Sequence, residues 1–132
     1  MLSLEVVMRR VVVESWLLLL YFEFVIRFWG FRTMSEIVRE GKVRSAPARA
    51  LPRSADLSHA MDLACVFYFK QVMCLQRSAA TTLLLRRHGL RAELVIGAQI
   101  LPFKSHAWTE IGGVVVNDKP YMMDIYRVLE RC

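Results

Sequence analysis

An apolar stretch near the N-terminus constrains the fold of this chain more than any other feature. Residues 11–31 read VVVESWLLLLYFEFVIRFWGF, and only Glu14, Glu23 and Arg27 carry charge within them. A membrane-spanning helix needs about twenty consecutive apolar residues, whereas the longest uncharged piece here is residues 15–22. Glu23 and Arg27 are spaced i,i+4, so they can pair on one helix face. The stretch therefore predicts a long helix, apolar on most faces, rather than a transmembrane span.

The surface of such a helix must be covered by the rest of the fold, by a partner protein or by a membrane surface. A secretory signal is not favoured, because the nearest small-residue cleavage pattern, at residues 46–48, follows a further charged segment. Hydrophobic residues form 55% of the 132-residue chain, which excludes intrinsic disorder and is more than one small core needs. We expect the surplus at 11–31 to form a docking surface, with poor solubility of the isolated protein and improvement on co-expression with its partner.

The charge balance is positive. The net charge of +6 comes from 18 Lys and Arg residues against 12 Asp and Glu residues. Residues 70–91 hold five positive side chains and no acidic one. This stretch could contact an acidic leader or partner, or it could be a solvated helix face.

The three cysteines, Cys65, Cys74 and Cys132, are irregularly spaced and include no CxxC pair. A disulfide framework or a structural zinc site is therefore not expected, and a reducing cytoplasm is the favoured compartment. The question becomes whether one cysteine is a nucleophile.

Turn signals organise the chain. Residues 33–36 (TMSE) form a capping-box pattern, and Gly41 is expected to end the short helix that follows. Residues 42–54 contain two prolines, four basic residues and no acid, which predicts an exposed linker. We expect a helical arm at 1–41, this linker, and a compact core at 55–132.

The core reads as helices followed by strands. In the first part of the core, the spacing of apolar and polar residues favours helices. Further along the chain, apolar and polar residues alternate as in half-buried strands, and Gly112-Gly113 is a hairpin signal. The expected helices are residues 56–70 and 74–87, and the expected strands are residues 91–97, 105–111, 114–116 and 121–126. This order predicts an α+β fold with an antiparallel sheet.

Three residues of the core have the types that a cysteine peptidase needs: Cys74, His106 and Asp118. Cys74 is expected at the start of a helix, where free amide groups and the helix dipole stabilise a thiolate. His106 is expected on a strand, and Asp118 follows the hairpin, so it can lie beside His106. Each also has an ordinary structural alternative, as a core cysteine, a structural histidine and a turn aspartate. Cys65, within ACVFYF, is expected to be a core residue.

Several ordered blocks around these residues resemble the lasso peptide maturation proteases, the transglutaminase-like leader peptidases of lasso peptide biosynthesis. The blocks are CLQRS at 74–78, LLRRHG at 84–89, LVIG at 94–97, PF at 102–103, HAW at 106–108 with Glu110, and VND at 116–118. The resemblance covers residues 55–130, and the apolar arm matches in general character. With no leader-recognition domain visible upstream, the chain resembles the stand-alone, split form of the enzyme.

The resemblance implies a transglutaminase-like or papain-like core in which Cys74 is the nucleophile, His106 the general base and then acid, and Asp118 the residue that orients His106. The enzyme would hydrolyse a peptide bond near the end of the leader of a lasso precursor and free the amine of the core peptide. It would work with a small leader-binding recognition protein, and an ATP-dependent, asparagine-synthetase-like cyclase would use the freed amine. No cofactor, metal or nucleic acid is implied.

Two other functions are compatible with the sequence. One is a transglutaminase-like acyltransferase, in which an amine rather than water resolves the acyl-enzyme. The other is a non-catalytic helical adaptor or membrane-associated scaffold that uses the apolar arm to dock a partner.

Some site assignments stay open. We expect the backbone amide of Cys74 to be one oxyanion donor. Gln71 is a candidate for the second donor, and the alternative is that Gln71 is simply a solvent-facing helix residue. Trp108 could shield the site from water or simply fill the core. Asp124 is the rival of Asp118, which is preferred because its Val-Asn-Asp-x-Pro context matches the family.

Overall fold

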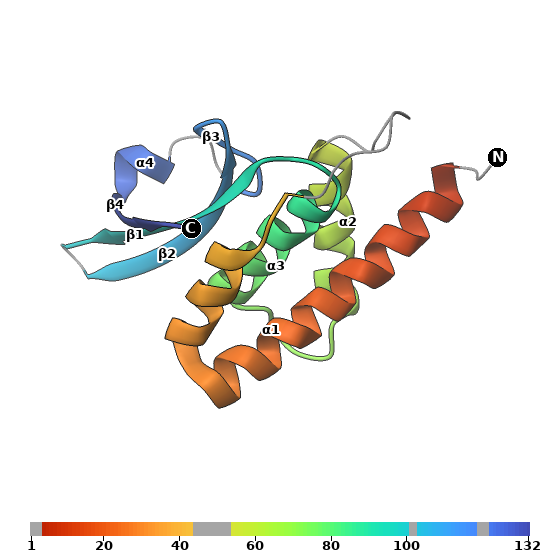
Figure 1. The fold of residues 1–132 in the computed structure, drawn as a ribbon, viewed down its shortest axis with the longest axis horizontal. Helices are drawn as coiled ribbons and strands as arrows, with labels where there is room; N and C mark the ends of the chain where they lie inside the picture. Colours follow the sequence, from red (N-terminus) through yellow and green to blue (C-terminus); the bar gives the residue numbers. More distant parts are fainter. Residues whose placement is uncertain (1–3, 44–53, 101–102, 119–121) are drawn as a thin grey trace.

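The computed structural model describes residues 4–43, 54–100, 103–118 and 122–132 (Figure 1). Three long helices are followed by a four-stranded sheet, so the predicted α+β class is confirmed. The elements are α1 (Leu4–Glu40), α2 (Ser54–Phe67), α3 (Cys74–Arg87), β1 (Ala92–Gln99), β2 (Lys104–Ile111), β3 (Val114–Val115), α4 (Met122–Ile125) and β4 (Arg127–Arg131). The strand order is β3-β2-β1-β4, and neighbouring strands are antiparallel.

Helix α3 lies at the centre of the molecule, between the other two long helices and the sheet (Figure 1). It packs against α1 and α2 on one side and against β1 and β2 on the other. Buried residues of all three helices and of one sheet face form the main core. A second, small core of Val95, Trp108 and Met122 covers the opposite face of the sheet. The central position of α3 fixes its N-terminus close to β2.

Helix α1 is bent at Gly30, whose backbone is outside the helical region at φ 82° and ψ −179°. Positive φ is accessible to glycine without steric cost. Helical residues resume directly after it, so the break lies at this glycine rather than at the expected capping box of residues 33–36. The helix ends at Glu40, before Gly41 as expected. Residues 44–53 of the expected linker lie outside the described residues.

The two faces of α1 differ in their surroundings. Its main buried residues are Val11, Leu19, Phe22, Val25, Met34 and Val38, while Val13, Leu17, Tyr21, Phe24, Phe28 and Trp29 are exposed. The helix is thus both packed into the core and apolar on its outer side. Among the described residues, no helix has the length and apolarity that a membrane crossing requires.

Hydrogen bonds between buried polar groups join α3 to β2. The Ser78 hydroxyl donates to the carbonyl of Ala107 at 2.9 Å and accepts from Asn117 Nδ2 at 3.1 Å. The hydroxyls of Thr82 and Thr109 are 3.1 Å apart, and Asn117 Oδ1 accepts from the amide of Thr109 at 2.7 Å. Directional bonds of this kind fix the helix against the strand in one position.

A buried arginine joins the ends of four elements. The guanidinium of Arg86 donates to the carbonyls of Val38, Gly41, Ala92 and Cys132. The sequence placed Arg86 in a solvated or partner-facing basic stretch, and for this residue both interpretations are wrong. Other basic residues of the stretch pair within the chain, namely Lys70 with Glu23, Arg77 with Asp62 and Arg87 with Glu14.

The C-terminal segment differs from the expectation. The sequence predicted a strand at 121–126, whereas Met122–Ile125 form the short helix α4 and the last strand is Arg127–Arg131. The amide of Tyr126 donates to the carbonyl of Met122 at 2.9 Å, which closes the helical turn. In β4 exposed and half-buried side chains alternate, and the sequence hides this alternation because the apolar Leu129 is exposed while the charged Glu130 is half-buried.

Candidate active site

Cys74 is the first residue of α3. Met73 before it is extended, at φ −79° and ψ 152°, and no side chain among the described residues caps this end of the helix. The first amide groups of an α-helix have no partner within the helix. The amide of Cys74 therefore has the character required of an oxyanion donor, and the thiol lies at the positive end of the helix dipole.

A cavity of about 160 Å³ lies where the start of α3 meets the sheet. Cys74 and His106 both line it, so the fold brings these two residues to one place although 31 positions separate them in the chain. The remaining lining residues are Phe31, Leu75, Ile96, Ser105 and Ala107. Cys74 as a residue is partly exposed.

His106 is hydrogen-bonded to Asp118. The distance between His106 Nε2 and Asp118 Oδ2 is 2.5 Å, and about a quarter of each side chain is exposed. The hairpin between β2 and β3 makes this contact possible, because Gly112 and Gly113 adopt φ of 58° and 83° and return the chain along β2. Two successive residues with positive φ are typical of the tight turns that match the twist of a β-hairpin.

The ring of His106 stacks on two aromatic side chains. Its centroid is 5.4 Å from that of Tyr126 and 6.2 Å from that of Trp108, with interplanar angles of 30° for both pairs. Gly97 pairs with His106 across the sheet, and a Cβ on Gly97 would lie 2.8 Å from both Trp108 Cη2 and Tyr126 Cβ. A glycine is therefore required here for the aromatic residues to pack beside His106. Gly97 belongs to the LVIG block, but nothing in the sequence indicated that it or Tyr126 would lie beside His106, since neither belongs to a catalytic residue pattern.

Trp108 is completely buried and is itself held in place. Its indole Nε1 donates to Glu110 Oε2 at 2.7 Å, and Arg131 donates to Glu110 Oε1 at 2.8 Å. Of the two expected roles, core packing is what these contacts show. Glu110 is only 1% exposed, and a buried carboxylate is costly unless it is paired, so Glu110 needs both Trp108 and Arg131 as partners.

Gln71 and Asp124 are the two other expected candidates. Gln71 is exposed in the loop before α3 rather than in a helix, and it is not among the residues that line the cavity of Cys74 and His106. Asp124 is in α4. Burial raises the pKa of the Cys65 thiol and that of the Cys132 thiol above their ordinary values. In the described part of the chain, no three His, Cys, Asp or Glu side chains are grouped so that they could hold a metal ion.

A helix that begins with a cysteine, packed against an antiparallel sheet that carries a histidine, defines the class of this protein. The chain matches the family model of the transglutaminase-like superfamily over residues 18–131, and it belongs to that superfamily. The family prediction is thereby confirmed, and the match includes the second part of α1.

One curated relative is informative. The microcin J25-processing protein McjB of Escherichia coli is 45% identical to this chain over 56 residues, which are 42% of this chain and 27% of that protein. The aligned part is thus less than a third of the relative's length. No solved structure gives a significant match.

Proposed function

We propose that this protein is a cysteine peptidase that removes the leader from a lasso peptide precursor in the cytoplasm. The observation that carries the proposal is the shared cavity of Cys74 and His106, together with the 2.5 Å contact between His106 Nε2 and Asp118. A nucleophile, a base and a group that orients the base are the parts of a hydrolytic triad.

The contact with Asp118 assigns the two nitrogens of His106. Because Nε2 is hydrogen-bonded to the carboxylate, Nδ1 is the ring nitrogen that can accept the thiol proton of Cys74. The resulting thiolate attacks the carbonyl carbon of the scissile bond and forms a C–S bond. The backbone amide of Cys74 donates to the developing oxyanion.

Collapse of this intermediate breaks the C–N bond, and the imidazolium of His106 gives its proton to the leaving amine. Water then attacks the thioester while His106 removes a proton from it. A C–O bond forms, the C–S bond breaks, and the leader is released as a free acid with the thiolate restored.

The substrate class rests on the relative that processes a microcin and on the sequence blocks that resemble leader peptidases. The freed amine of the core peptide is the group that a separate ATP-dependent, asparagine-synthetase-like cyclase would join to an acidic side chain. An exposed apolar face on α1 supports docking of the small leader-binding protein that presents the precursor. Its residues recur every three or four positions, namely Val13, Leu17, Tyr21, Phe24 and Phe28.

Cleavage of a precursor tests the proposal directly. Purified protein, incubated with a lasso precursor and the leader-binding protein, should cut one bond, and Cys74→Ala should abolish cleavage while the circular dichroism spectrum is retained. Mass spectrometry of the products should show a free leader acid. An amide adduct of the leader would instead identify an acyltransferase, and cleavage by Cys74→Ala at the normal rate would refute the assignment of the nucleophile.

Thiol reactivity separates an enzyme from an adaptor. Iodoacetamide should alkylate Cys74 much faster than Cys65 or Cys132, since burial raises the pKa of the latter two thiols. Equally slow alkylation of all three cysteines would favour a non-catalytic adaptor.

The third triad position has a matched pair of variants. Asp118→Ala should lower the cleavage rate at least a hundredfold, because His106 loses the partner that orients it, and Asp124→Ala should not. The opposite result would transfer the orienting role to Asp124.

A further inference from the structure

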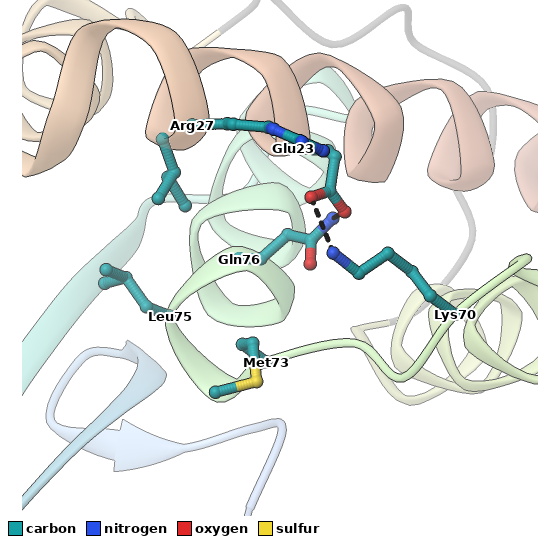
Figure 2. A pocket seen from close by; sticks show the side chains of 7 residues that line it. Glu23, Arg27, Lys70, Met73, Leu75 and Gln76 are labelled. Atoms are coloured by element: carbon teal, nitrogen blue, oxygen red, sulfur yellow. Dashed lines mark hydrogen bonds and ion pairs between the residues drawn. The ribbon is translucent and has the colours of Figure 1, made fainter.

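A second cavity lies beside the catalytic candidate, between α1 and the start of α3. Its volume is about 290 Å³, and it is lined by Glu23, Ile26, Arg27, Lys70, Met73, Leu75 and Gln76. Figure 2 shows Gln76 of α3 and Lys70 of the loop before α3 approaching Glu23 of α1, with Leu75 and Met73 at the foot of α3 beside them. The volume is at the lower limit of sites that take a whole small molecule, and it suits a single side chain better.

The polar groups at one end of this cavity are already paired. Glu23 Oε2 is 3.0 Å from Lys70 Nζ, and Glu23 Oε1 accepts from Tyr68 at 3.2 Å and from Gln76 Nε2 at 3.3 Å. Burial and the neighbouring Glu23 carboxylate raise the pKa of Tyr68 to about 12, so its hydroxyl stays protonated and continues to donate. Gln76 is 4% exposed and also donates to the carbonyl of Leu19 at 2.8 Å.

These bonds leave the aliphatic surfaces of the cavity as its binding surface. Ile26 of α1 and Leu75 of α3 contribute branched side chains, and Met73 adds a flexible thioether that adapts to different shapes. A charged ligand would have to compete with Lys70 for Glu23 or remain at the rim near Arg27. The chemistry therefore favours an apolar side chain.

The cavity is next to the reacting thiol. Met73 and Leu75 are the chain neighbours of Cys74, and Leu75 lines both this cavity and the cavity of Cys74 and His106. Consecutive Cα atoms are about 3.8 Å apart, and an extended peptide advances about 3.3 Å per residue. A peptide whose carbonyl is at Cys74 thus reaches the second cavity within about two residues.

We infer that this cavity is the specificity subsite of the peptidase and that it takes an apolar side chain of leucine or methionine size from a substrate residue within two positions of the scissile bond. The inference rests on the proposed function, because it requires a peptide bound at Cys74. It assigns Ile26, Met73 and Leu75 as the residues that determine which leader is accepted.

The test uses the full chain and a panel of peptidyl acyloxymethyl ketones, which alkylate catalytic thiols. In the panel, each of the two residues nearest the reactive group is in turn Gly, Ala, Leu, Phe or Asp, and intact-mass spectrometry measures the labelling rate of Cys74. At one position we expect Leu to react about ten- to a hundredfold faster than Gly, as burial of one such side chain would give. Asp should be no better than Gly.

Enlarging the cavity should change this preference. Ile26→Ala should shift the optimum from Leu towards Phe, and Met73→Ala should reduce the advantage of Leu over Gly. Met73 is 65% exposed, so its variant reports on the subsite even if Ile26→Ala weakens the fold. Glu40→Ala, an exposed position of the same helix, is the control and should leave the size preference unchanged.

The outcomes separate the subsite from the proposed function. Labelling of Cys74 at equal rates by all probes, a preference for Asp, or an unchanged size preference in both cavity variants would overturn the subsite and leave the peptidase assignment intact. Failure of every probe, with Cys74 no more reactive to iodoacetamide than Cys65, would overturn both.

Discussion

Helices α1 and α3 are attached to the same core by different interactions. Large apolar side chains such as Leu19 and Phe22 hold α1, with the carboxylates of Glu14 and Glu23 at its margins. Helix α3 instead buries small and polar residues against β2, and Ser78 and Thr82 make hydrogen bonds there. Apolar packing is strong but non-directional, whereas a buried hydrogen bond fixes distance and angle.

This difference matches the roles that the proposed function gives to the two helices. Cys74 and His106 are on α3 and β2, the two elements that hydrogen bonds hold in register, and a triad requires such positional accuracy. Helix α1 supplies walls to the two cavities through Phe31 and Ile26 and has an outer face to spare for a partner. Under the proposed function, catalytic geometry depends on the hydrogen bonds between α3 and β2, and partner docking depends on the outer face of α1.

The largest expected effect is on the free energy of unfolding, and it concerns the buried apolar side chains that hold α1 in the core. Phe22 is fully buried, and Phe22→Ala should lower the free energy of unfolding by about 3–5 kcal/mol, the usual cost of removing a buried ring. Phe24, two residues later on the same helix, is 49% exposed, and Phe24→Ala should cost less than about 1 kcal/mol. Urea unfolding followed by circular dichroism measures both variants.

The same pair tests whether the outer face of α1 is free in the isolated protein. Equal destabilisation by Phe22→Ala and Phe24→Ala would mean that this face is covered in solution, for example by a second copy. Size-exclusion chromatography of the wild-type chain would then show a dimer. Unequal losses of the sizes given above, in an isolated protein whose poor solubility improves on co-expression with the partner, would support the assignment of an open docking face.

Removing a hydrogen bond that holds α3 against β2 should lower stability less than Phe22→Ala does, but it should lower activity more. Ser78→Ala removes the donor to the Ala107 carbonyl and the acceptor for Asn117 Nδ2, and the loss of these two hydrogen bonds should cost about 2 kcal/mol. Ala107 is the neighbour of His106, so precursor cleavage should slow at least tenfold through misplacement of the base. Unfolding curves and cleavage rates measure the two effects.

Ser58→Ala is the matched control for this comparison. The Ser58 hydroxyl donates to the carbonyl of Val116 at 3.1 Å and joins α2, rather than α3, to the segment after β3. Its loss should cost about 1 kcal/mol and leave the cleavage rate within twofold. If Ser78→Ala and Ser58→Ala reduce cleavage equally, the α3–β2 bonds have no special role in positioning.

The parts of the fold with strong local signals were predictable from the sequence. Helix α3 was predicted at its observed bounds, because residues 74–87 contain good helix formers and end at His88-Gly89. The glycine pair at 112–113 likewise identified the hairpin and placed β3 next to β2. Cys74, His106 and Asp118 were identifiable from their residue types and their order in the chain, and the family blocks around them pointed to the same three residues.

Features that depend on tertiary contacts could not be predicted in this way. Nothing in a window around Arg86 distinguishes a guanidinium that satisfies four buried carbonyls from one in solvent. Gly97 is required by Trp108 and Tyr126, which are distant in the chain. The second cavity forms only where α1 packs against the start of α3. From the sequence, residues 11–31 could be recognised only as a surplus of apolar residues.

The smallest expected effect is on the pH dependence of stability, and it concerns the Glu14 carboxylate of α1. Glu14 accepts from His88 at 2.7 Å and from Arg87 at 3.0 Å. Burial acts to raise the pKa of the Glu14 carboxyl, but these hydrogen bonds and the charges behind them outweigh it, so the pKa is lower than its ordinary value. A group whose pKa is lower in the folded state stabilises the fold above its unfolded pKa, and this contribution is lost as the pH falls through the folded value. The wild-type protein should therefore lose part of its stability below about pH 4.

Glu14→Gln should remove this part of the acid sensitivity. At pH 7 it should cost less than about 1 kcal/mol, because Arg87 and His88 pair with Glu14 at the surface, where solvent screens the charges. Urea midpoints measured from about pH 7 to pH 3 should fall less steeply for Glu14→Gln than for the wild type, while Glu36→Gln, an exposed position of the same helix, should follow the wild type. Parallel wild-type and Glu14→Gln curves would show that apolar packing alone fixes α1. The contrast between the two helices would then be sharper, because directional interactions would fix only α3.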